Sequence, residues 1–395
     1  MNNLKGKDSE SFFTATFKQI RGGEHTDCYF QRTLQILKAK GINKRVVAEV
    51  FAKELPCGWS WGVLGGVQEV VRLFKGFPLI IKGLKEGTFF SPRQPVLSIE
   101  GNYTDFGLYE TALLGLLCQS SGITAAAARC RKAAGDRILL SFGARRMHPT
   151  ISPMIERGAF IGGCDGVSEA LSAQMIGEKP QGTMPHALIL VMGDTVEATR
   201  AFHQVIARDI KRISLIDTFN DEKFESLRVA GSLGKELYGL RFDTPSSRRG
   251  NLVEILREVR WELNLRGYAD VKLFVSGGVD EKSILELNSL ADGYGVGTFI
   301  SNAPVVNFSL DIVEIEGEPL AKRGKESGRK KLVRCPQCYT SKVLAEREPE
   351  GNCPCGGKFE HLTQPLIEGG ELVYPLASPQ ELRRYVLEQL SHYEL

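Results

Sequence analysis

The sequence predicts a mixed α/β protein built around an incomplete parallel α/β barrel of about seven strands. Three observations carry this prediction. Between residues 106 and 305, short apolar runs alternate with segments of helical character, as expected of parallel βα units. On both sides of that region the chain is strand-like without this alternation, which predicts a strand-rich α+β domain made from the N- and C-terminal segments. Four clustered cysteines near the C-terminus predict a small third module.

The first hundred residues contain two strand-like runs, 80–83 and 95–101, each bounded by glycine or proline. Residues 45–55 are predicted to form one short helix. Residues 105–134 are rich in leucine and alanine and predict a longer helix, interrupted near 120–122 by Ser-Ser-Gly.

The barrel region is predicted from alternating strands and helices, which either close into an incomplete α/β barrel or lie open as a doubly wound sheet. The expected strands are 138–142, 159–164, 187–192, 212–217, 238–242, 271–275 and 293–300. The expected helices between the later strands are 195–207, 221–233, 252–263 and 281–290. Ligands of such folds bind at the carboxyl ends of the strands, so the residues that follow each strand are the candidates for function.

These elements predict three parts. A strand-rich domain covers 1–105 and is completed by 306–330 and 360–395. The barrel covers 106–305, and a cysteine-rich module covers 331–360.

Composition narrows the function classes. The chain has 395 residues and a net charge of only +3, which argues against a dedicated nucleic-acid binder. No apolar run reaches the ~20 residues of a membrane span, and the polar N-terminus is unlike a secretory signal. We therefore expect a cytoplasmic protein. Residues 322–334 hold seven Lys/Arg and one Glu, and this run predicts an exposed linker.

Two glycine-rich turns follow consecutive predicted strands. Ser276, Gly277 and Gly278 follow the strand at 271–275, and Gly297 with Thr298 lies in the next strand segment. Glycines at such positions let backbone N–H groups approach a phosphate without a Cβ in the way. The pair of turns favours a phosphate site over two structural turns.

Aromatic and charged side chains follow the other strands. Phe142 offers a ring for stacking, and Arg145 with Arg146 places two cations beside it, which suits an anionic ligand. Arg241 and Asp243 are two residues apart at a strand end, so they face the same way and either share a ligand or form a structural ion pair.

The four C-terminal cysteines form two close pairs. Cys335 and Cys338 are followed, after fourteen residues, by Cys353 and Cys355. Two such pairs near proline and glycine are typical of a closed four-thiolate site for structural Zn²⁺. Zinc and iron stay open from the sequence, as do free thiols and a regulatory disulfide.

These motifs, in this order, resemble the nicotinate phosphoribosyltransferase family. The resemblance runs from Thr26-Asp-Cys-Tyr29 to about residue 302 and rests on Phe-Gly-x-Arg, Gly-Thr-Met-x-His, Arg-x-Asp and the glycine turns. The cysteine module is similar to an extra domain of short prokaryotic members. One motif departs from the larger members, because Arg241-Phe-Asp-Thr-Pro245 replaces Arg-x-Asp-Ser-Gly.

The resemblance implies that nicotinate displaces pyrophosphate from 5-phosphoribosyl-1-pyrophosphate, with Mg²⁺ on the pyrophosphate, in NAD salvage. It also implies a role for each motif residue. Phe142 stacks on one face of the pyridine ring, Tyr29 of a neighbouring subunit covers the other face, and Asp165 lies near the ring. Asp243 contacts the ribose, and His186 is phosphorylated if the enzyme is ATP-coupled. The carboxylate or the phosphates are neutralised by Arg145, Arg146 or Arg241, and the 5′-phosphate is bound by Ser276, Gly277, Gly278, Gly297 and Thr298.

Alternatives stay open at this point. The same chemistry could act on quinolinate, which calls for more cations around the ring, or on nicotinamide, which calls for fewer. A zinc-knuckle protein that binds RNA or a protein partner is the alternative of another class. A shared site requires at least a homodimer, and whether ATP is used is not readable from the sequence.

Overall fold

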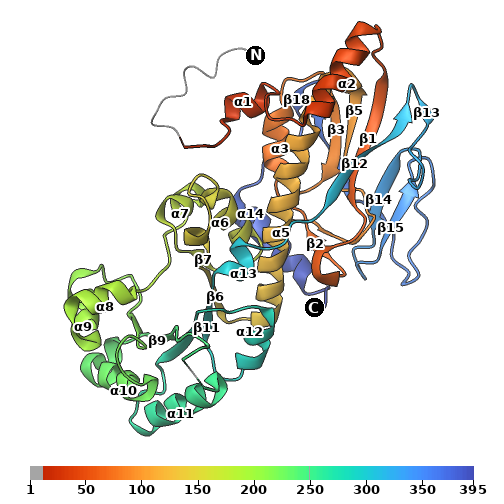
Figure 1. Ribbon diagram of the computed structural model, residues 1–395. Helices are drawn as coiled ribbons and strands as arrows, with labels where there is room; N and C mark the ends of the chain where they lie inside the picture. Colours follow the sequence, from red (N-terminus) through yellow and green to blue (C-terminus); the bar gives the residue numbers. More distant parts are fainter. Residues whose placement is uncertain (1–11, 249) are drawn as a thin grey trace. The chain divides into compact units, whose positions relative to one another are not determined.

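The computed structural model describes residues 12–248 and 250–395 (Figure 1). The chain divides into two units. The N-terminal unit comprises residues up to 122 together with 305–378, and the barrel unit comprises 123–304 together with 379–395. The last helix, α14 (Pro379–Leu390), thus belongs to the barrel unit, whereas the sequence placed 360–395 with the N-terminal domain.

The N-terminal unit is organised by an antiparallel sheet of seven strands among the described residues. Its order is β13-β12-β1-β5-β3-β17-β18, so the C-terminal strands lie on both sides of the N-terminal ones. The strands are β1 (Arg45–Ala52), β3 (Ile80–Leu84), β5 (Leu97–Asn102), β12 (Phe308–Ile315), β13 (Glu318–Pro319), β17 (Thr363–Glu368) and β18 (Glu371–Leu372). This confirms the predicted sheet built from both ends of the chain.

The predicted helix at 45–55 is wrong, because residues 45–52 form the central strand β1. Val46, Val47 and Val50 are β-branched and buried, and such residues pack well on a pleated sheet that is covered on both faces. A short continuous apolar run does not reveal its periodicity, which is why the sequence misled here.

Helices α1 (Phe17–Arg21), α2 (Cys28–Ala39), α3 (Val67–Phe74) and α4 (Tyr103–Phe106) belong to this unit, as do the short strands β2 (Gly62–Val63) and β4 (Phe89–Phe90).

Helix α5 (Glu110–Ala134) is continuous, so the predicted interruption near 120–122 is wrong. Ser121 is buried, and its Oγ accepts the Gly65 N–H at 3.0 Å, a tertiary contact that outweighs the low helix propensity of this stretch.

The segment Tyr103–Ala134 is long and apolar enough to cross a membrane by length and composition, contrary to the expectation from the sequence. Within the described residues, 67% of its most apolar window is buried inside the protein. A mostly buried helix of this kind is typical of a protein core and is weak evidence for a membrane span.

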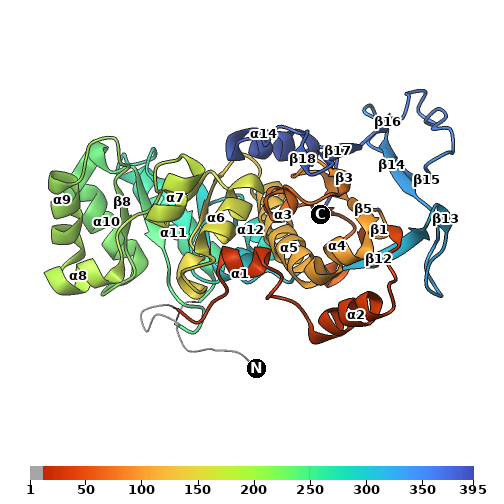
Figure 2. The same ribbon diagram turned by 90° about the horizontal axis from the view of Figure 1, so that it is seen from above.

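The barrel unit contains a parallel half-barrel with six strands in its described part, not seven. The order is β7-β6-β11-β10-β9-β8 (Figure 1, Figure 2). The strands are β6 (Ile138–Ser141), β7 (Gly166–Val167), β8 (Ile213–Leu215), β9 (Gly239–Phe242), β10 (Lys272–Val275) and β11 (Gly293–Val296). The accompanying helices are α6 (Ser152–Ile161), α7 (Ala170–Ile176), α8 (His186–Met192), α9 (Thr195–Val205), α10 (Glu222–Leu233), α11 (Leu252–Leu265), α12 (Glu281–Leu287) and α13 (Thr298–Ser301).

Two predicted strands of the barrel are wrong. Residues 159–164 are the end of helix α6 and the turn after it, and 187–192 lie in helix α8. Both are apolar runs of six residues, a length at which composition does not separate a strand from a buried helix. The four later helices are confirmed, and Asp194 caps α9 by accepting the Val196 N–H at 2.9 Å.

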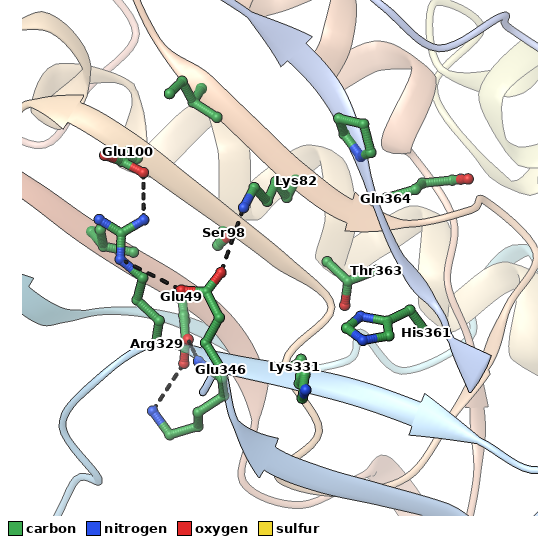
Figure 3. Close-up of a pocket in the computed structure, with 14 residues that line it drawn as sticks. Glu49, Lys82, Ser98, Glu100, Arg329, Lys331, Glu346, His361, Thr363 and Gln364 are labelled. Atoms are coloured by element: carbon green, nitrogen blue, oxygen red, sulfur yellow. Dashed lines mark hydrogen bonds and ion pairs between the residues drawn. The ribbon is translucent and has the colours of Figure 1, made fainter. Parts of the chain in front are cut away.

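The cysteine-rich module forms a small sheet of β14 (Lys330–Arg334), β15 (Ser341–Ala345) and β16 (Glu360–His361). The predicted exposed linker at 322–334 is therefore wrong over β14, whose Leu332 is buried in the core of the N-terminal unit. Many of its charges are paired rather than solvated. Lys330 Nζ lies 3.0 Å from Glu49 Oε2. Arg329 donates to Glu100 Oε2 at 2.6 Å and pairs with Glu314. Figure 3 shows the pocket that Arg329, Glu100 and Glu346 line, where Arg329 Nε lies 4.0 Å from Glu346 Oε2.

Candidate active site

The carboxyl ends of five strands meet at one edge of the half-barrel. Because β6, β11, β10, β9 and β8 are consecutive neighbours in the sheet, the residues that follow them are neighbours too. Two backbone hydrogen bonds tie these tips together. The Phe142 N–H donates to Val296 O at 2.8 Å, and the Ser276 N–H donates to Phe242 O at 2.8 Å.

The sheet makes room for the Phe142 ring with a glycine. A Cβ at Gly295 would lie 2.2 Å from Phe142 Cε2, so no larger residue fits in β11 at this position. Nearer the start of β11, the Phe274 ring lies between Gly239 and Gly293. A Cβ at Gly239 would lie 2.9 Å from a ring carbon of Phe274, and a Cβ at Gly293 would lie 2.6 Å from another. These strand glycines accommodate aromatic rings.

Arg241 lies beside the Phe142 ring, with its guanidinium carbon 5.7 Å from the ring centroid. Its Nη2 donates to Met184 O at 3.1 Å, whereas its Nε is buried without a hydrogen-bond partner. Burial lowers the pKa of Arg241, and the carboxylates of Asp243 and Asp217 act against that shift. A buried cation with an unused N–H group is a strong site for an anionic ligand.

Asp243 connects the tips of β9 and β10. Its Oδ1 accepts a hydrogen bond from Ser276 Oγ at 2.7 Å. Gly277 has φ +81°, and a Cβ there would lie 3.0 Å from both the carbonyl oxygen and Oδ1 of Asp243. The position therefore requires glycine both for its backbone conformation and for the close approach of Asp243.

His186 faces two carboxylates. Its Nε2 lies 3.4 Å from Asp243 Oδ2 and 3.9 Å from Asp217 Oδ2, and its Nδ1 lies 3.0 Å from Thr218 Oγ1. The Asp217 side chain is only 3% exposed, and its Oδ1 lacks a hydrogen-bond partner. Burial raises the pKa of Asp217, while the His186 charge lowers it.

Sequence reasoning missed Asp217 and Thr218. The available signal was position, since Asp217 comes two residues after the end of β8 and Asp243 comes directly after β9. His186 was singled out as the residue before a strand. It is instead the first residue of α8, and the Thr218 contact orients its ring.

The two glycine turns are adjacent and accessible. Gly277 and Gly278 have φ +81° and +73°, and both are exposed after β10. Gly297 follows the neighbouring strand β11, and Thr298 is exposed at the start of α13. Together they form an open backbone surface of the kind that accepts a phosphate.

Arg145 and Arg146 lie in the exposed 3₁₀ turn Ala144–Arg146 that follows Phe142. Arg145 is close enough to Arg241 that its charge lowers the pKa of Arg241. The edge of the half-barrel thus combines a stacking ring, three arginines, two carboxylates and exposed backbone amides.

Comparison with known protein families finds matches in both units of the chain. Residues 27–121 match the family quinolinate phosphoribosyl transferase, N-terminal domain, and residues 123–311 match its C-terminal domain. A nicotinate phosphoribosyltransferase of Mycobacterium tuberculosis is 31% identical over 379 residues, covering 85% of this chain and 83% of that protein. The chain belongs to the nicotinate and quinolinate phosphoribosyltransferase family.

Solved structures agree. The crystal structure of a nicotinate-nucleotide pyrophosphorylase from Pyrococcus furiosus is 52% identical, with a TM-score of 0.95 over 97% of this chain and 99% of that one. The human nicotinic acid phosphoribosyltransferase, 20% identical over 93% of this chain and 94% of that one, shares the fold with a TM-score of 0.75. The protein is therefore a phosphoribosyltransferase, and the alternative of a non-catalytic RNA- or partner-binding protein is not supported.

One predicted site residue of this phosphoribosyltransferase, Asp165, lies elsewhere. Asp165 precedes β7 at the amino ends of the strands, where it accepts the Leu139 N–H at 2.9 Å and pairs with Arg131 at 2.5 Å and Arg383 at 2.7 Å. The expectation that it lies near the pyridine ring is corrected, because its carboxylate pairs with these two arginines at the opposite end of the half-barrel. Tyr29 lies on α2 of the N-terminal unit, 56% exposed, and donates to Asp27 Oδ2 at 3.2 Å.

The four cysteines converge as predicted for a metal site. The sulfurs of Cys335, Cys338, Cys353 and Cys355 all lie within 4.8 Å of one another, with separations of 3.5 Å for Cys335–Cys355 and 3.4 Å for Cys338–Cys353. A tetrahedral Zn²⁺ with bonds of about 2.3 Å separates its sulfurs by about 3.8 Å, so the set fits such an ion. A Cβ at Gly357 would lie 2.7 Å from Cys335 Sγ, which explains the glycine.

Proposed function

We propose that this phosphoribosyltransferase joins nicotinate to the phosphoribosyl group of 5-phosphoribosyl-1-pyrophosphate, giving nicotinate mononucleotide and pyrophosphate in NAD salvage. The observation that carries the proposal is Arg241 beside Phe142, with its buried Nε lacking a partner. A pyridine ring stacked on Phe142 brings a carboxylate within reach of that guanidinium, and a carboxylate is the acceptor that a buried arginine prefers. The Mycobacterium tuberculosis relative, which is named for nicotinate, supports the same base.

The chemistry needs no general base, because the ring nitrogen of nicotinate is already a nucleophile. The bond from C1 of the ribose to the pyrophosphate oxygen breaks as the bond to the ring nitrogen forms, and the ribose carries positive charge between the two. The protein's part is to position both substrates and to stabilise these charges.

Each part of the site has a role in that scheme. The carboxylates of Asp243 and Asp217 face the developing ribosyl cation, and Asp243 accepts a hydrogen bond from a ribose hydroxyl group. Ser276, Gly277, Gly278, Gly297 and Thr298 hold the 5′-phosphate, and Arg145 and Arg146 neutralise the pyrophosphate.

Mg²⁺ is expected with the pyrophosphate, and the carboxylates of Asp217 and Asp243 are the charged oxygen ligands that we assign to it at this edge. When bound, the ion neutralises the leaving group. Asp217 fits this role, since its Oδ1 is buried and lacks a protein partner.

Coupling to ATP would act through His186, whose Nε2 faces Asp217 and Asp243. Incubation with γ-labelled ATP tests it. An acid-labile label that is lost in His186→Ala supports coupling. No label on the wild-type protein, together with a turnover indifferent to ATP, removes the idea.

By the family resemblance, Tyr29 of a neighbouring subunit covers the second face of the pyridine ring, so the proposal includes a homodimer or larger oligomer. The cytoplasmic location also stays a prediction. The four-cysteine site holds structural Zn²⁺ in this scheme, with no part in the reaction.

The base is tested by comparing kcat/KM for nicotinate, quinolinate and nicotinamide at saturating 5-phosphoribosyl-1-pyrophosphate. We expect nicotinate to be preferred at least tenfold. Preference for quinolinate would contradict the choice of base while leaving the class of reaction intact. No activity with any of the three would contradict the proposed function itself.

A further inference from the structure

A buried acid lies beneath the turn that carries the stacking ring. The Glu156 side chain, from helix α6, is 0% exposed. Its Oε1 accepts the Ala144 N–H at 3.2 Å, and Ser152 Oγ of the same helix approaches Ala144 O at 3.4 Å. Helix α6 therefore holds the backbone of Ala144, two residues after Phe142, by both its N–H and its C=O groups.

The other side of this turn has no free space. A Cβ at Gly143 would lie 2.5 Å from Ser301 Cβ and 2.9 Å from Gly297 O. The turn is thus packed against the loop after β11, while the Phe142 ring covers Gly295. A displacement of Ala144 has to move the ring, Arg145 or the phosphate loop, because the turn cannot shift without them.

The acid itself is poorly compensated where it lies. Glu156 Oε2 has no hydrogen-bond partner, and neither has the buried Ser141 Oγ, the hydroxyl that acts on the same carboxyl from the end of β6. Burial raises the pKa of Glu156 to about 7, and the Glu169 carboxylate, which caps α7, acts in the same direction. The Cys164 thiol after the end of α6 has its own pKa raised by burial, so it adds no charge near neutral pH. The Ser141 hydroxyl and the Ala144 N–H act against that shift.

We propose that Glu156 is a positioning residue for the base, whose buried carboxyl sets the place of the Phe142 ring relative to Arg241 through the backbone of Ala144. This inference rests on the proposed function. It goes further by assigning base affinity to a side chain that touches no substrate, and by making that affinity depend on the protonation of the side chain. The neutral carboxyl keeps the Ala144 hydrogen bond without adding a negative charge beneath a site for an anionic base.

The test compares Glu156→Ala, Glu156→Gln and a matched control, Asp292→Asn, in the full-length protein. Asp292 is also a carboxylate that accepts a strand N–H, from Leu273 at 2.9 Å, but it lies at the amino end of β11. Steady-state kinetics give KM for nicotinate and for 5-phosphoribosyl-1-pyrophosphate separately between pH 6 and 8.5, and thermal unfolding reports stability.

For Glu156→Ala we expect KM for nicotinate to rise at least tenfold, with KM for 5-phosphoribosyl-1-pyrophosphate within twofold. Glu156→Gln keeps an acceptor for Ala144, so it should restore KM to within threefold. It should also remove the rise in KM for nicotinate that the wild-type protein shows as the pH passes about 7. Asp292→Asn should leave both KM values within twofold even if its Tm falls.

Three results would overturn the inference. The first is a nicotinate KM that changes less than twofold in Glu156→Ala, and the second is a parallel rise of both KM values. The third is a Glu156→Gln variant with the wild-type pH profile. Each is distinct from failure of the proposed function, in which the wild-type protein itself does not act on nicotinate.

Discussion

Replacing Arg241 by alanine removes the one group on which the choice of base depends most. Its guanidinium lies 5.7 Å from the Phe142 ring and holds a buried, unused Nε–H. Loss of a preorganised donor of this kind raises an activation barrier by about 2.7–4 kcal/mol. At about 1.36 kcal/mol per tenfold change in rate, kcat/KM for nicotinate should fall at least a hundredfold.

The fold should survive this substitution, because the structure gives Arg241 one hydrogen bond, to Met184 O at 3.1 Å. Initial rates of pyrophosphate release measure kcat/KM, and circular dichroism with thermal unfolding checks the fold. Arg241→Lys keeps a charge but loses the planar fork, so it should recover only part of the activity. Arg260→Ala is the matched control, since this arginine pairs with Asp292 at 3.0 Å away from the strand tips. A folded Arg241→Ala variant with less than a threefold change would refute the role.

The remaining predictions concern packing, the metal and pH. Gly295→Ala should displace the Phe142 ring, because the new Cβ would lie 2.2 Å from it, and should raise KM for nicotinate more than tenfold; an unchanged KM would contradict the packing argument. Chelation of the wild-type protein, or the substitution Cys335→Ser, should remove one equivalent of Zn²⁺ per chain, as measured by metal analysis, and should lower Tm. A wild-type protein that is purified without metal, and whose Tm does not change when Zn²⁺ is added, would refute the site. Burial raises the pKa of Glu110 to about 7, helped by Asp311 and opposed by Lys322, so the folded state binds the extra proton. Its contribution to stability is therefore present below the ordinary pKa near 4.5 and is lost as the pH rises to about 7. The free energy of unfolding of Glu110→Gln, measured in denaturant, should not fall over this pH range as that of the wild-type protein does. The same pH dependence in the variant and in the wild-type protein would contradict a raised pKa at Glu110.

Sequence patterns alone placed the main parts of the site. Alternation of apolar runs and helices predicted parallel βα units, and that topology brings the ends of the strands to one edge whatever the details of the loops. Phe142, Asp243 and the turn at Gly277 come just after β6, β9 and β10, and Arg241 lies near the end of β9, so the neighbouring strand ends bring these residues to one edge. The sequence also predicted that the four cysteines come together, because each close pair lies within one short turn and the two pairs are only fourteen residues apart.

The tertiary structure decided which side chains join that edge and which do not. Residues 187–192 form a helix instead of a strand, and His186 faces Asp217, a residue that no local motif marks. The resemblance implies that Asp165 lies near the pyridine ring, but its carboxylate pairs with two arginines at the other end of the strands. Short apolar runs suit a strand and a buried helix equally well, and the partners of a charged side chain come from distant parts of the chain. Only the closed packing of the half-barrel determines both.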